Sequence, residues 1–440
     1  MITKTMAIAI GVVAILAIGG GAAVLVMNND KGNTDSGDDL SSFLGLVYGN
    51  ADGDSKIDSA DVALMDKIIA GTESLSDHPL ADANRDGTVD DKDKEIANKV
   101  INGQETTLFV KDATRIVSVK FPMGNIFTAG GTNMRLMVQV LDIENKIVAD
   151  ATTSYIGPVM DCTLYNLREN GTIKKLNTSA GQDDFKALNT VKGTKGLSTA
   201  IIEERSITGY LDDDARSIFA DLDIEIMSFS IDSIKGLRQS LATMGILTGS
   251  EALAKSYIDV LDNTLDTVKT KIGTKYGTAT VMDVTMSNSV SGTQSEYFAM
   301  TELAGGKNLA DWPDKTRVFD HGDTWLYEEK YNPDYLFHFK SMEYGKTATD
   351  TELDSYKSYF KETTAYKNGH YYLLNGVVPV HVRLAWMASI MYADCFEAGW
   401  VDMLFQEYMD TYNEINQGKT SSDPGYFSVT DPAYAYYWTV

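Results

Sequence analysis

The sequence contains few of the residues that build metal clusters and disulfide frameworks. Its 440 residues include 2 cysteines and 5 histidines. Two cysteines, Cys162 and Cys395, are too few for a disulfide scaffold or for a zinc site made of four cysteines. They could form one bridge, but their positions in the sequence do not pair them. Two buried thiols are the simpler expectation.

Positive charge is also scarce. The chain carries 38 Lys and Arg residues against 62 Asp and Glu residues, which gives a formal net charge of −24. A protein that binds nucleic acid needs a basic surface to neutralise the phosphates. The charge balance therefore argues against nucleic acid as a partner.

Common catalytic motifs are absent as well. The sequence has no Gly-x-Ser-x-Gly nucleophile elbow, no complete Gly-x-x-x-x-Gly-Lys-Ser/Thr phosphate loop and no His-Glu-x-x-His pair. Glu203 and Glu204 are adjacent carboxylates, but a solvated run of charge explains them without a catalytic role. The sequence favours a binding protein and not an enzyme.

Only one apolar run, residues 6–27, is long enough to cross a membrane. About 20 residues span a bilayer, whereas the apolar part of a signal peptide has about 7–15. Lys4 precedes the run and polar residues follow it, which places the bulk of the chain outside the cytoplasm. We expect residues 1–27 to be a transmembrane anchor or a cleaved export signal, and residues 28–43 to be a flexible linker.

An internal repeat follows the linker. Residues 50–71, "NADGDSKIDSADVALMDKIIAG", align without gaps with residues 82–103, "DANRDGTVDDKDKEIANKVING". Each copy has an acidic loop and then a short helical pattern that ends on Gly, the residue preferred after a helix C-terminus. The repeat predicts two equivalent loop-helix units.

The acidic loops have the spacing of calcium-binding loops. Ca²⁺ takes six or more oxygen ligands, drawn from positions 1, 3, 5, 7, 9 and 12 of such a loop. Position 6 is Gly87 in the second loop but Ser55 in the first, which predicts strain in the first loop if a positive φ is needed there. The expected ligands are Asn50, Asp52, Asp54, the Lys56 carbonyl, Asp58 and Asp61, then Asp82, Asn84, Asp86, the Thr88 carbonyl, Asp90 and Asp93.

Residues 44–104 resemble the dockerin modules. The resemblance rests on Asp at position 12 of each loop, one helix per loop and the short repeat. It implies a small α-helical domain that calcium folds and that docks a cohesin-type protein through its helices.

The remainder of the chain predicts an α/β architecture. Strand-like and helix-like segments alternate over 112–415. The segments 114–121 and 278–287 each predict a strand that opens an α/β half. Between them, 248–273 has apolar residues at three- and four-residue steps, which predicts one long amphipathic helix. Thr248 and Glu251 predict a capping box at its start.

The second half resembles the substrate-binding proteins of ABC importers for ferric siderophores, haem and vitamin B12, called cluster A. The resemblance is carried by the hinge at 221–272, "YFAMTELAGGKNLAD" at 297–311, "NPDYLFHF" at 332–339 and the closing helix at 378–396. It implies two Rossmann-like lobes joined by one long helix. The implied parts are lobe 1 at 112–228, spine helices at 229–273, and lobe 2 with a C-terminal tail at 274–440.

The resemblance also implies a ligand in the cleft at the carboxyl ends of the strands, where aromatic faces and a few charged groups hold a metal chelate or corrinoid. It implies an ABC permease as partner, met through an acidic residue near Asp323. A second reading remains open, in which the protein is a cell-surface scaffold that docks a cohesin-type partner. The candidate ligand-binding residues are Tyr155, Ser291, Gln294, Trp312, Arg317, His321 and Arg383.

Overall fold

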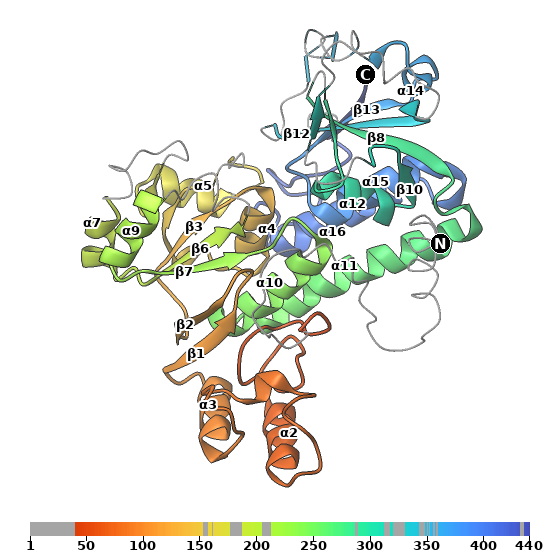
Figure 1. Cartoon of the computed structure of the whole chain (residues 1–440). Helices are drawn as coiled ribbons and strands as arrows, with labels where there is room; N and C mark the ends of the chain where they lie inside the picture. The colour runs from red at the N-terminus through yellow and green to blue at the C-terminus, as the bar shows by residue number, and fades with distance from the viewer. Residues whose placement is uncertain are drawn as a thin grey trace. The chain divides into compact units, whose positions relative to one another are not determined.

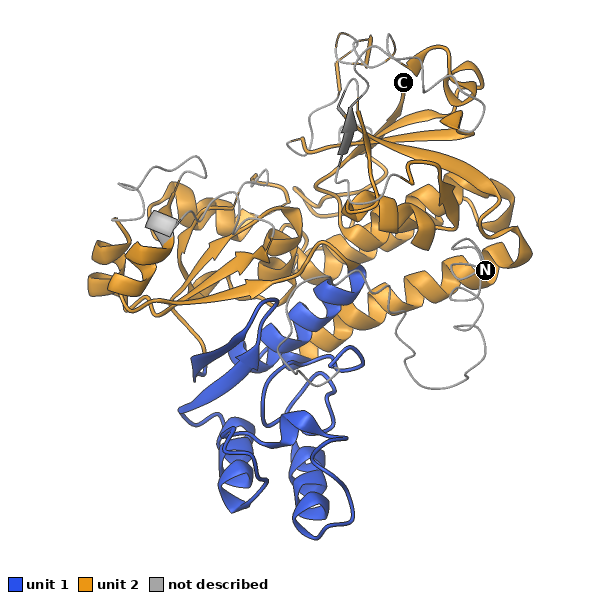
Figure 2. Cartoon of the chain, in the orientation of Figure 1, with its two compact units in different colours: residues 1–122, 234–251 blue, residues 123–233, 252–440 orange. Residues whose placement is uncertain are grey.

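A computed structural model gives the fold, and its described residues fall into two compact units (Figure 2). The first unit comprises residues up to Pro122 together with Ile234–Glu251, and the second comprises Met123–Ser233 and Ala252–Val440. The described residues are 40–152, 157–160, 162–176, 187–204, 213–286, 289–311, 317–319, 331–342, 348–349, 351, 353–354, 357, 360–431 and 435–440.

The first unit contains the predicted repeat. Its two helices, α2 (Ser59–Ile69) and α3 (Asp91–Ile101), lie side by side (Figure 1). Each helix begins with a capping box, formed by Asp58 with Asp61 in α2 and by the equivalent residues of α3. Such a box satisfies two amide groups that the first helical turn leaves without partners. The two predicted loop-helix units are therefore confirmed.

A β-hairpin follows the repeat. The strands β1 (Thr106–Lys111) and β2 (Ile116–Phe121) pair antiparallel as a sheet of their own. A bridge between Val47 and Val110 attaches the segment before the first loop to this hairpin. The strand expected at 114–121 is present, but it closes a hairpin and does not open the first α/β sheet. Residue alternation alone does not determine which strand becomes its partner.

The first sheet of the second unit is fully parallel, as expected for strands connected by helices. Together with its helices it forms the first lobe, residues 123–233. Its core packs Phe127 of the sheet against Phe219 of a covering helix. The strands, in sheet order, are β5 (Lys174–Lys175), β4 (Ile147–Asp150), β3 (Ile126–Ala129), β6 (Thr199–Glu203) and β7 (Glu225–Phe229). The helices are α4 (Thr132–Val140), α5 (Cys162–Glu169), α7 (Leu188–Lys195) and α9 (Asp213–Asp221), with η3 (Glu144–Lys146).

The second sheet is mixed and belongs to the second lobe, residues 274–440. Its central strands are parallel, and antiparallel strands flank them. The aromatic C-terminal tail contributes β14, which pairs with β13 of this lobe. The strands are β11 (Arg317–Phe319), β9 (Ser289–Ser291), β8 (Ala279–Met286), β12 (Tyr335–Lys340), β13 (Tyr371–Asn375) and β14 (Tyr437–Thr439), with β10 (Gly306–Asn308) beside β8. The helices are α12 (Glu296–Leu303), α14 (Thr364–Lys367), α15 (Val380–Met391) and α16 (Trp400–Tyr412), with η4 (Gly273–Lys275) and η7 (Ala393–Cys395).

The long helix predicted between the two sheets is α11 (Glu251–Ile272). The capping box predicted at its start is wrong. Thr248 is the last residue of the preceding helix, α10 (Ile234–Thr248), and its hydroxyl donates back to the Met244 carbonyl at 2.6 Å. A Thr hydroxyl inside a helix commonly makes this bond, which competes with capping of the next helix.

The predicted anchor at 6–27 lies outside the described residues. Among the helices that the structure does describe, none combines the length and apolar character needed to cross a membrane. Cys162 and Cys395 are free thiols, and each is partly exposed, not buried.

Candidate calcium loops and ligand-binding lobes

The first ligand position of the first loop is occupied by a fully buried amide, Asn50. Its Nδ2 donates to the Gly45 carbonyl at 2.7 Å and to the Asp54 carbonyl at 2.9 Å. Among the described residues, its Oδ1 has no hydrogen-bond partner. A buried oxygen without a partner costs about 1–3 kcal/mol unless something else satisfies it. A hard cation at this position would do so.

The last ligand position of the first loop is a buried carboxylate, Asp61. It accepts the backbone N–H groups of Asp52 at 3.2 Å and Asp58 at 2.7 Å. Burial raises the pKa of Asp61 to about 7, with the neighbouring charge of Asp52 acting in the same direction. A bound cation would reverse this shift, because it stabilises the ionised form.

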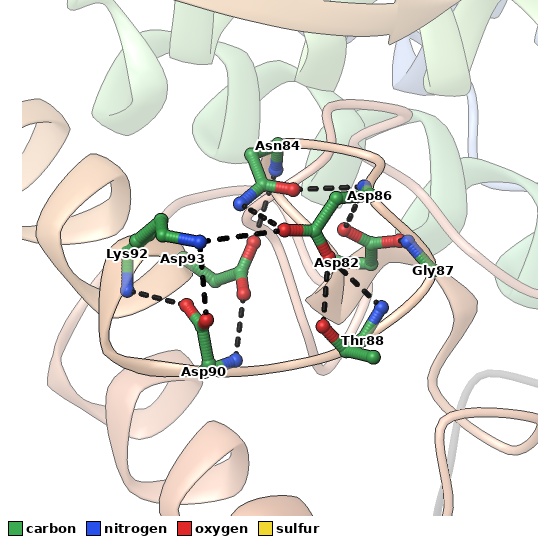
Figure 3. Close-up of polar contacts among 8 residues, drawn as sticks. All are labelled: Asp82, Asn84, Asp86, Gly87, Thr88, Asp90, Lys92 and Asp93. Atoms are coloured by element: carbon green, nitrogen blue, oxygen red, sulfur yellow. Dashed lines mark hydrogen bonds and ion pairs between the residues drawn. The ribbon is translucent and has the colours of Figure 1, made fainter.

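The second loop is closed by hydrogen bonds of the same kind (Figure 3). Asp82 accepts the backbone N–H groups of Asp86 at 3.1 Å and Gly87 at 2.8 Å. Asp93 accepts from the Asn84 N–H at 3.0 Å and from a second loop amide, as Asp61 does in the first loop. Asp61 and Asp93, at the last ligand position, therefore have the same role in the two loops.

Lys92 lies beside two carboxylates of the second loop. The Lys92 ammonium is 3.7 Å from Asp86 Oδ2 and 3.4 Å from Asp90 Oδ2 (Figure 3). In the part of the chain that the structure describes, no three His, Cys, Asp or Glu side chains form a group that could hold a metal ion. The loop carboxylates instead accept from loop amides and Lys92. The donor set is nevertheless all oxygen, with Asn50 Oδ1 unsatisfied, and oxygen ligands fit Ca²⁺ better than a soft metal.

The strain predicted at Ser55 does not occur. In the first loop the positive φ falls on Gly53, at 70°. In the second loop Arg85 has φ 59° and Gly87 has φ 93°. Ser55 is not among the positive-φ residues of the described chain, and the positive φ that the two loops share lies at position 4, Gly53 and Arg85.

Buried polar contacts join the two lobes of the second unit. Arg135 of α4 donates through Nη2 to the Val377 carbonyl at 2.7 Å. The Tyr408 hydroxyl of α16 donates to Gln139 Oε1 of α4 at 2.5 Å. Asn413, which follows α16, donates to the Met160 carbonyl at 2.8 Å. The donors and acceptors are buried, so these contacts fix the lobes to one another.

Arg383, a predicted ligand-binding residue, is fully buried in α15. Its Nη2 lies 3.5 Å from Asn133 Oδ1, and its guanidinium lies 6.0 Å from the centre of the Tyr297 ring. Asn133 also donates to the Ile231 carbonyl at 2.8 Å. The structure therefore places Arg383 within the contact between α4 and α15.

Of the other predicted cleft residues, the structure describes the surroundings of Ser291 and Gln294 only. Ser291 is buried in β9 with a hydroxyl that has no partner, and Gln294 is exposed just before α12. No hydrogen bond or ion pair links either residue to Arg383 among the described positions. Arg317 is described only as part of β11. Tyr155, Trp312, His321 and the docking position Asp323 lie outside the described residues.

The carboxyl end of β6 carries an acidic side chain that the sequence reading assigned to solvent. Glu203 is 2% exposed and its Oε2 accepts from the Gly131 N–H at 2.5 Å. The run of apolar residues that precedes it was the available signal, because such a run indicates a buried parallel strand. Glu203 lies at the edge of the first sheet where a ligand would be expected.

Asp283 of β8 was also missed. It is fully buried, accepts from the Thr301 hydroxyl at 2.7 Å and from Asn308 Nδ2 at 2.8 Å, and burial raises its pKa to about 8. Asn308 belongs to the "LAGGKN" segment on which the family resemblance rests. The contact explains that motif structurally, since it ties α12 and β10 to the central strand.

A surface pocket of about 360 Å³ lies at the opposite end of the second sheet. Its lining includes Ala279, Tyr335 and His370, which stand at or before the amino ends of β8, β12 and β13. Ligands of open parallel sheets bind at the carboxyl ends. This pocket is therefore separate from the predicted cleft.

The comparisons with known proteins match both parts of the chain. Residues 48–102 match the family model of the dockerin type I domain. No sequence match is found among curated proteins. Among solved structures, Helicobacter pylori CeuE with Ni(II) bound is similar at a TM-score of 0.54 and 14% identity, over 70% of this chain and 97% of that one.

Two further structures agree. The TroA-like periplasmic binding protein FepB of Veillonella parvula has a TM-score of 0.52 at 15% identity, over 69% of this chain and 95% of its own. Molybdate-bound MolA, the periplasmic binding protein of a Haemophilus influenzae ABC transporter, has 0.52 at 12% identity, over 69% and 97%. The chain thus contains a segment that matches the dockerin type I family, and its two-lobed part has the fold of TroA-like periplasmic binding proteins.

Proposed function

We propose that this protein is an extracytoplasmic substrate-binding protein that captures a small metal-containing ligand and delivers it to an ABC permease. The observation that carries the proposal is the pair of α/β lobes connected by the long helix α11. The similar FepB and MolA structures are those of periplasmic binding proteins, and the similar CeuE and MolA structures hold nickel and molybdate. No chemistry is performed on the ligand.

The mechanism is capture in the cleft with a small movement of the lobes. The buried contacts Arg135–Val377 and Tyr408–Gln139 would have to break for a wide opening. Each break would take a hydrogen-bond donor from a buried oxygen, at about 1–3 kcal/mol per group. A ligand therefore enters a cleft that is largely preformed.

The ligand class within this function is a ferric siderophore, haem or cobalamin. The proposed contact residues remain those of the sequence prediction, with Ser291 supported by its buried hydroxyl that lacks a partner. Glu203 is added because of its place at the end of β6. Its carboxylate favours a ligand that carries a cationic or hydrogen-bond-donating group over a purely anionic one.

The dockerin segment adds calcium and a second partner to the proposal. Ca²⁺ would be held by the twelve loop ligands predicted from the sequence, and Asn50 Oδ1 supports this for the first loop. In this structure the loop carboxylates accept hydrogen bonds from loop amides and pair with Lys92. A bound ion would instead give them one central positive charge. A cohesin-type protein would dock on the helices, and residues 6–27 would anchor the chain in the membrane.

The test is a titration of the full chain with cobalamin, haem, a ferric siderophore and molybdate in parallel, followed by Trp fluorescence and calorimetry. Saturable binding of one ligand at sub-micromolar Kd supports the proposal and names the class. The variant Arg317→Ala should weaken that binding, while Arg115→Ala in the β1–β2 turn should not. A folded chain that binds none of the four would overturn the transport function.

That negative result would favour the second candidate, a surface scaffold in which the dockerin segment is the functional part. Its supporting observation is the match of residues 48–102 to the dockerin type I family. Calcium-dependent capture of a purified cohesin domain, without binding of any small ligand, is the result that this alternative requires. Genes for a permease and an ATPase beside this one would argue for transport instead.

A further inference from the structure

Gly45 is the point at which the first calcium loop meets helix α10. A side-chain carbon placed on Gly45 would lie 2.5 Å from Ile246 Cδ1 of α10, 2.7 Å from Asn50 Nδ2 and 2.9 Å from the Asp54 carbonyl. All three distances are shorter than real Cβ contacts allow. Because Gly45 has no side chain, the first loop and α10 can both pack against its Cα.

On the loop side, three hydrogen bonds hold the segment around Gly45. The Leu44 N–H donates to the Gly53 carbonyl at 2.7 Å, and the Gly45 N–H donates to the Asp54 carbonyl at 2.8 Å. Asn50 Nδ2 donates to the Gly45 carbonyl at 2.7 Å. The Asn50 amide, whose buried Oδ1 has no partner among the described residues, thus also holds Gly45.

On the helix side, the same segment is bonded to two side chains of α10. The Leu46 N–H donates to Thr243 Oγ1 at 2.9 Å. Gln239 Nε2 donates to the Phe43 carbonyl at 2.8 Å and to the Leu40 carbonyl at 3.3 Å. Residues 40–46 therefore connect the first loop to α10 by hydrogen bonds at both ends.

The second loop has no such connection. Its polar side chains bond within the loop, and no hydrogen bond or ion pair runs from residues 82–93 to α10 in the described structure. Arg85 packs instead on the rings of Tyr48 and Phe109. Two loops with the same spacing of candidate ligands thus differ in what they touch.

We propose that calcium in the first loop orders helix α10, so that this loop is an internal structural switch and the second loop is not. The inference rests on the calcium assignment proposed above. A cation on Asn50 Oδ1 would fix and polarise the amide, and polarisation strengthens the bonds that its Nδ2 makes to Gly45 and Asp54. Because ion binding stabilises the ordered state of the loop, it also stabilises α10, which is hydrogen-bonded to residues 40–46.

The experiment is hydrogen–deuterium exchange of the full chain, with calcium or with EGTA, read from peptides of α10. Calcium should slow exchange in α10 by about tenfold or more, which corresponds to about 1.4 kcal/mol of local stability. The double variant Asp52→Ala/Asp54→Ala should abolish this effect. The matched variant Asp82→Ala/Asp86→Ala should retain it.

A second variant tests the physical link itself. Gly45→Ala should separate the loop from α10 and remove the calcium effect on α10 exchange, while the second loop still binds the ion. If that variant does not fold, Thr243→Val removes one hydrogen bond with almost no change in shape and should reduce the effect.

Ion counting by competition with a chromophoric chelator separates the two ways of failing. A chain that binds no calcium would overturn both the calcium assignment and this inference. A chain that binds two ions with unchanged α10 exchange would overturn the inference alone. An α10 response that follows the second-loop variant would also overturn it.

Discussion

The hydroxyl of Tyr257 in α11 lies 2.9 Å from Nδ1 of His381 in α15. Both residues are buried, and their rings meet edge to face with centroids 5.4 Å apart. Tyr408 and Tyr412 of α16 pack against the same tyrosine. The long helix α11 is therefore packed on the second lobe through an aromatic cluster. His381 lies inside this cluster, where it has a structural role.

The cluster predicts loss of stability in acid. Burial lowers the pKa of His381 to about 3, and the Arg383 charge acts in the same direction. In the unfolded chain His381 takes up a proton below its ordinary pKa of about 6.5, whereas in the folded chain it stays neutral. The contribution of His381 to stability is therefore fully present above that pH and falls as the pH drops towards 3. The cost is about 2 kcal/mol at pH 5.

Urea unfolding at pH 7.5 and pH 5 measures this difference. The variant His381→Gln should be less stable than the wild type at pH 7.5 but should lose less stability between the two pH values. His370→Gln, which changes a partly exposed ring, is the control. An unchanged pH dependence in the His381 variant would show that another group is responsible.

Asp283 predicts a pH dependence of the opposite sign. Burial raises its folded pKa to about 8, so the contribution of this group is most favourable below its ordinary pKa of about 4 and is lost as the pH rises towards 8. Asp283→Asn keeps the shape and can still accept from Thr301 and Asn308. We expect the variant to be less sensitive than the wild type to a rise from pH 5 to pH 8.

Thermal unfolding across that range is the measurement, and Asp334→Asn, at an exposed carboxylate before β12, is the matched control. A wild-type chain and an Asp283→Asn chain with parallel pH profiles would contradict the assignment. The two predictions use different groups, so the His381 result does not determine this one.

The contact between α16 and α4 predicts the cost of separating the lobes. Tyr408→Phe removes the hydroxyl that donates to Gln139 Oε1 and leaves that buried oxygen without its donor. We expect a loss of about 1–3 kcal/mol in the free energy of unfolding. Tyr437→Phe, at a ring that is 46% exposed, should change it by less than about 0.5 kcal/mol. Equal effects in the two variants would show that the lobe contact contributes nothing.

The sequence predicted the features that depend on neighbouring residues. The repeat, its two helices and the calcium-loop pattern are local, because each ligand lies within one short loop. The glycines after α2 and α3, Gly71 and Gly103, have φ of 73° and 65°. The periodicity of α11 likewise predicted a single long helix. In each case the spacing of residues was sufficient.

Features that join distant segments were not predicted. The contact between Arg383 and Asn133 joins residues 250 positions apart. The bond from Leu46 to Thr243 joins residues 197 positions apart. Nothing in the local pattern indicates such a partner. Gly45 was equally unremarkable in sequence, because a close approach by another segment leaves no periodic signal.

The two calcium loops give a final prediction from matched substitutions at position 6. Gly87 has φ 93° and no atom within 4 Å of an added side-chain carbon, so Gly87→Ser should be destabilising through backbone conformation alone, by about 1–2 kcal/mol. Ser55 lies outside the positive-φ region, whereas position 4 lies inside it in both loops, at Gly53 and Arg85. The exchange Ser55→Gly should therefore not strengthen calcium binding, although the sequence comparison alone predicts that it would.

Calorimetric titration of calcium into the two variants separates the explanations. We expect weaker binding at one site for Gly87→Ser, and unchanged or slightly weaker binding for Ser55→Gly, since a new glycine adds freedom to the free loop. Tighter binding in the Ser55 variant would mean that the first loop turns at position 6 when it holds the ion. In that case the conformation described for Gly53 and Ser55 would belong to the ion-free loop alone.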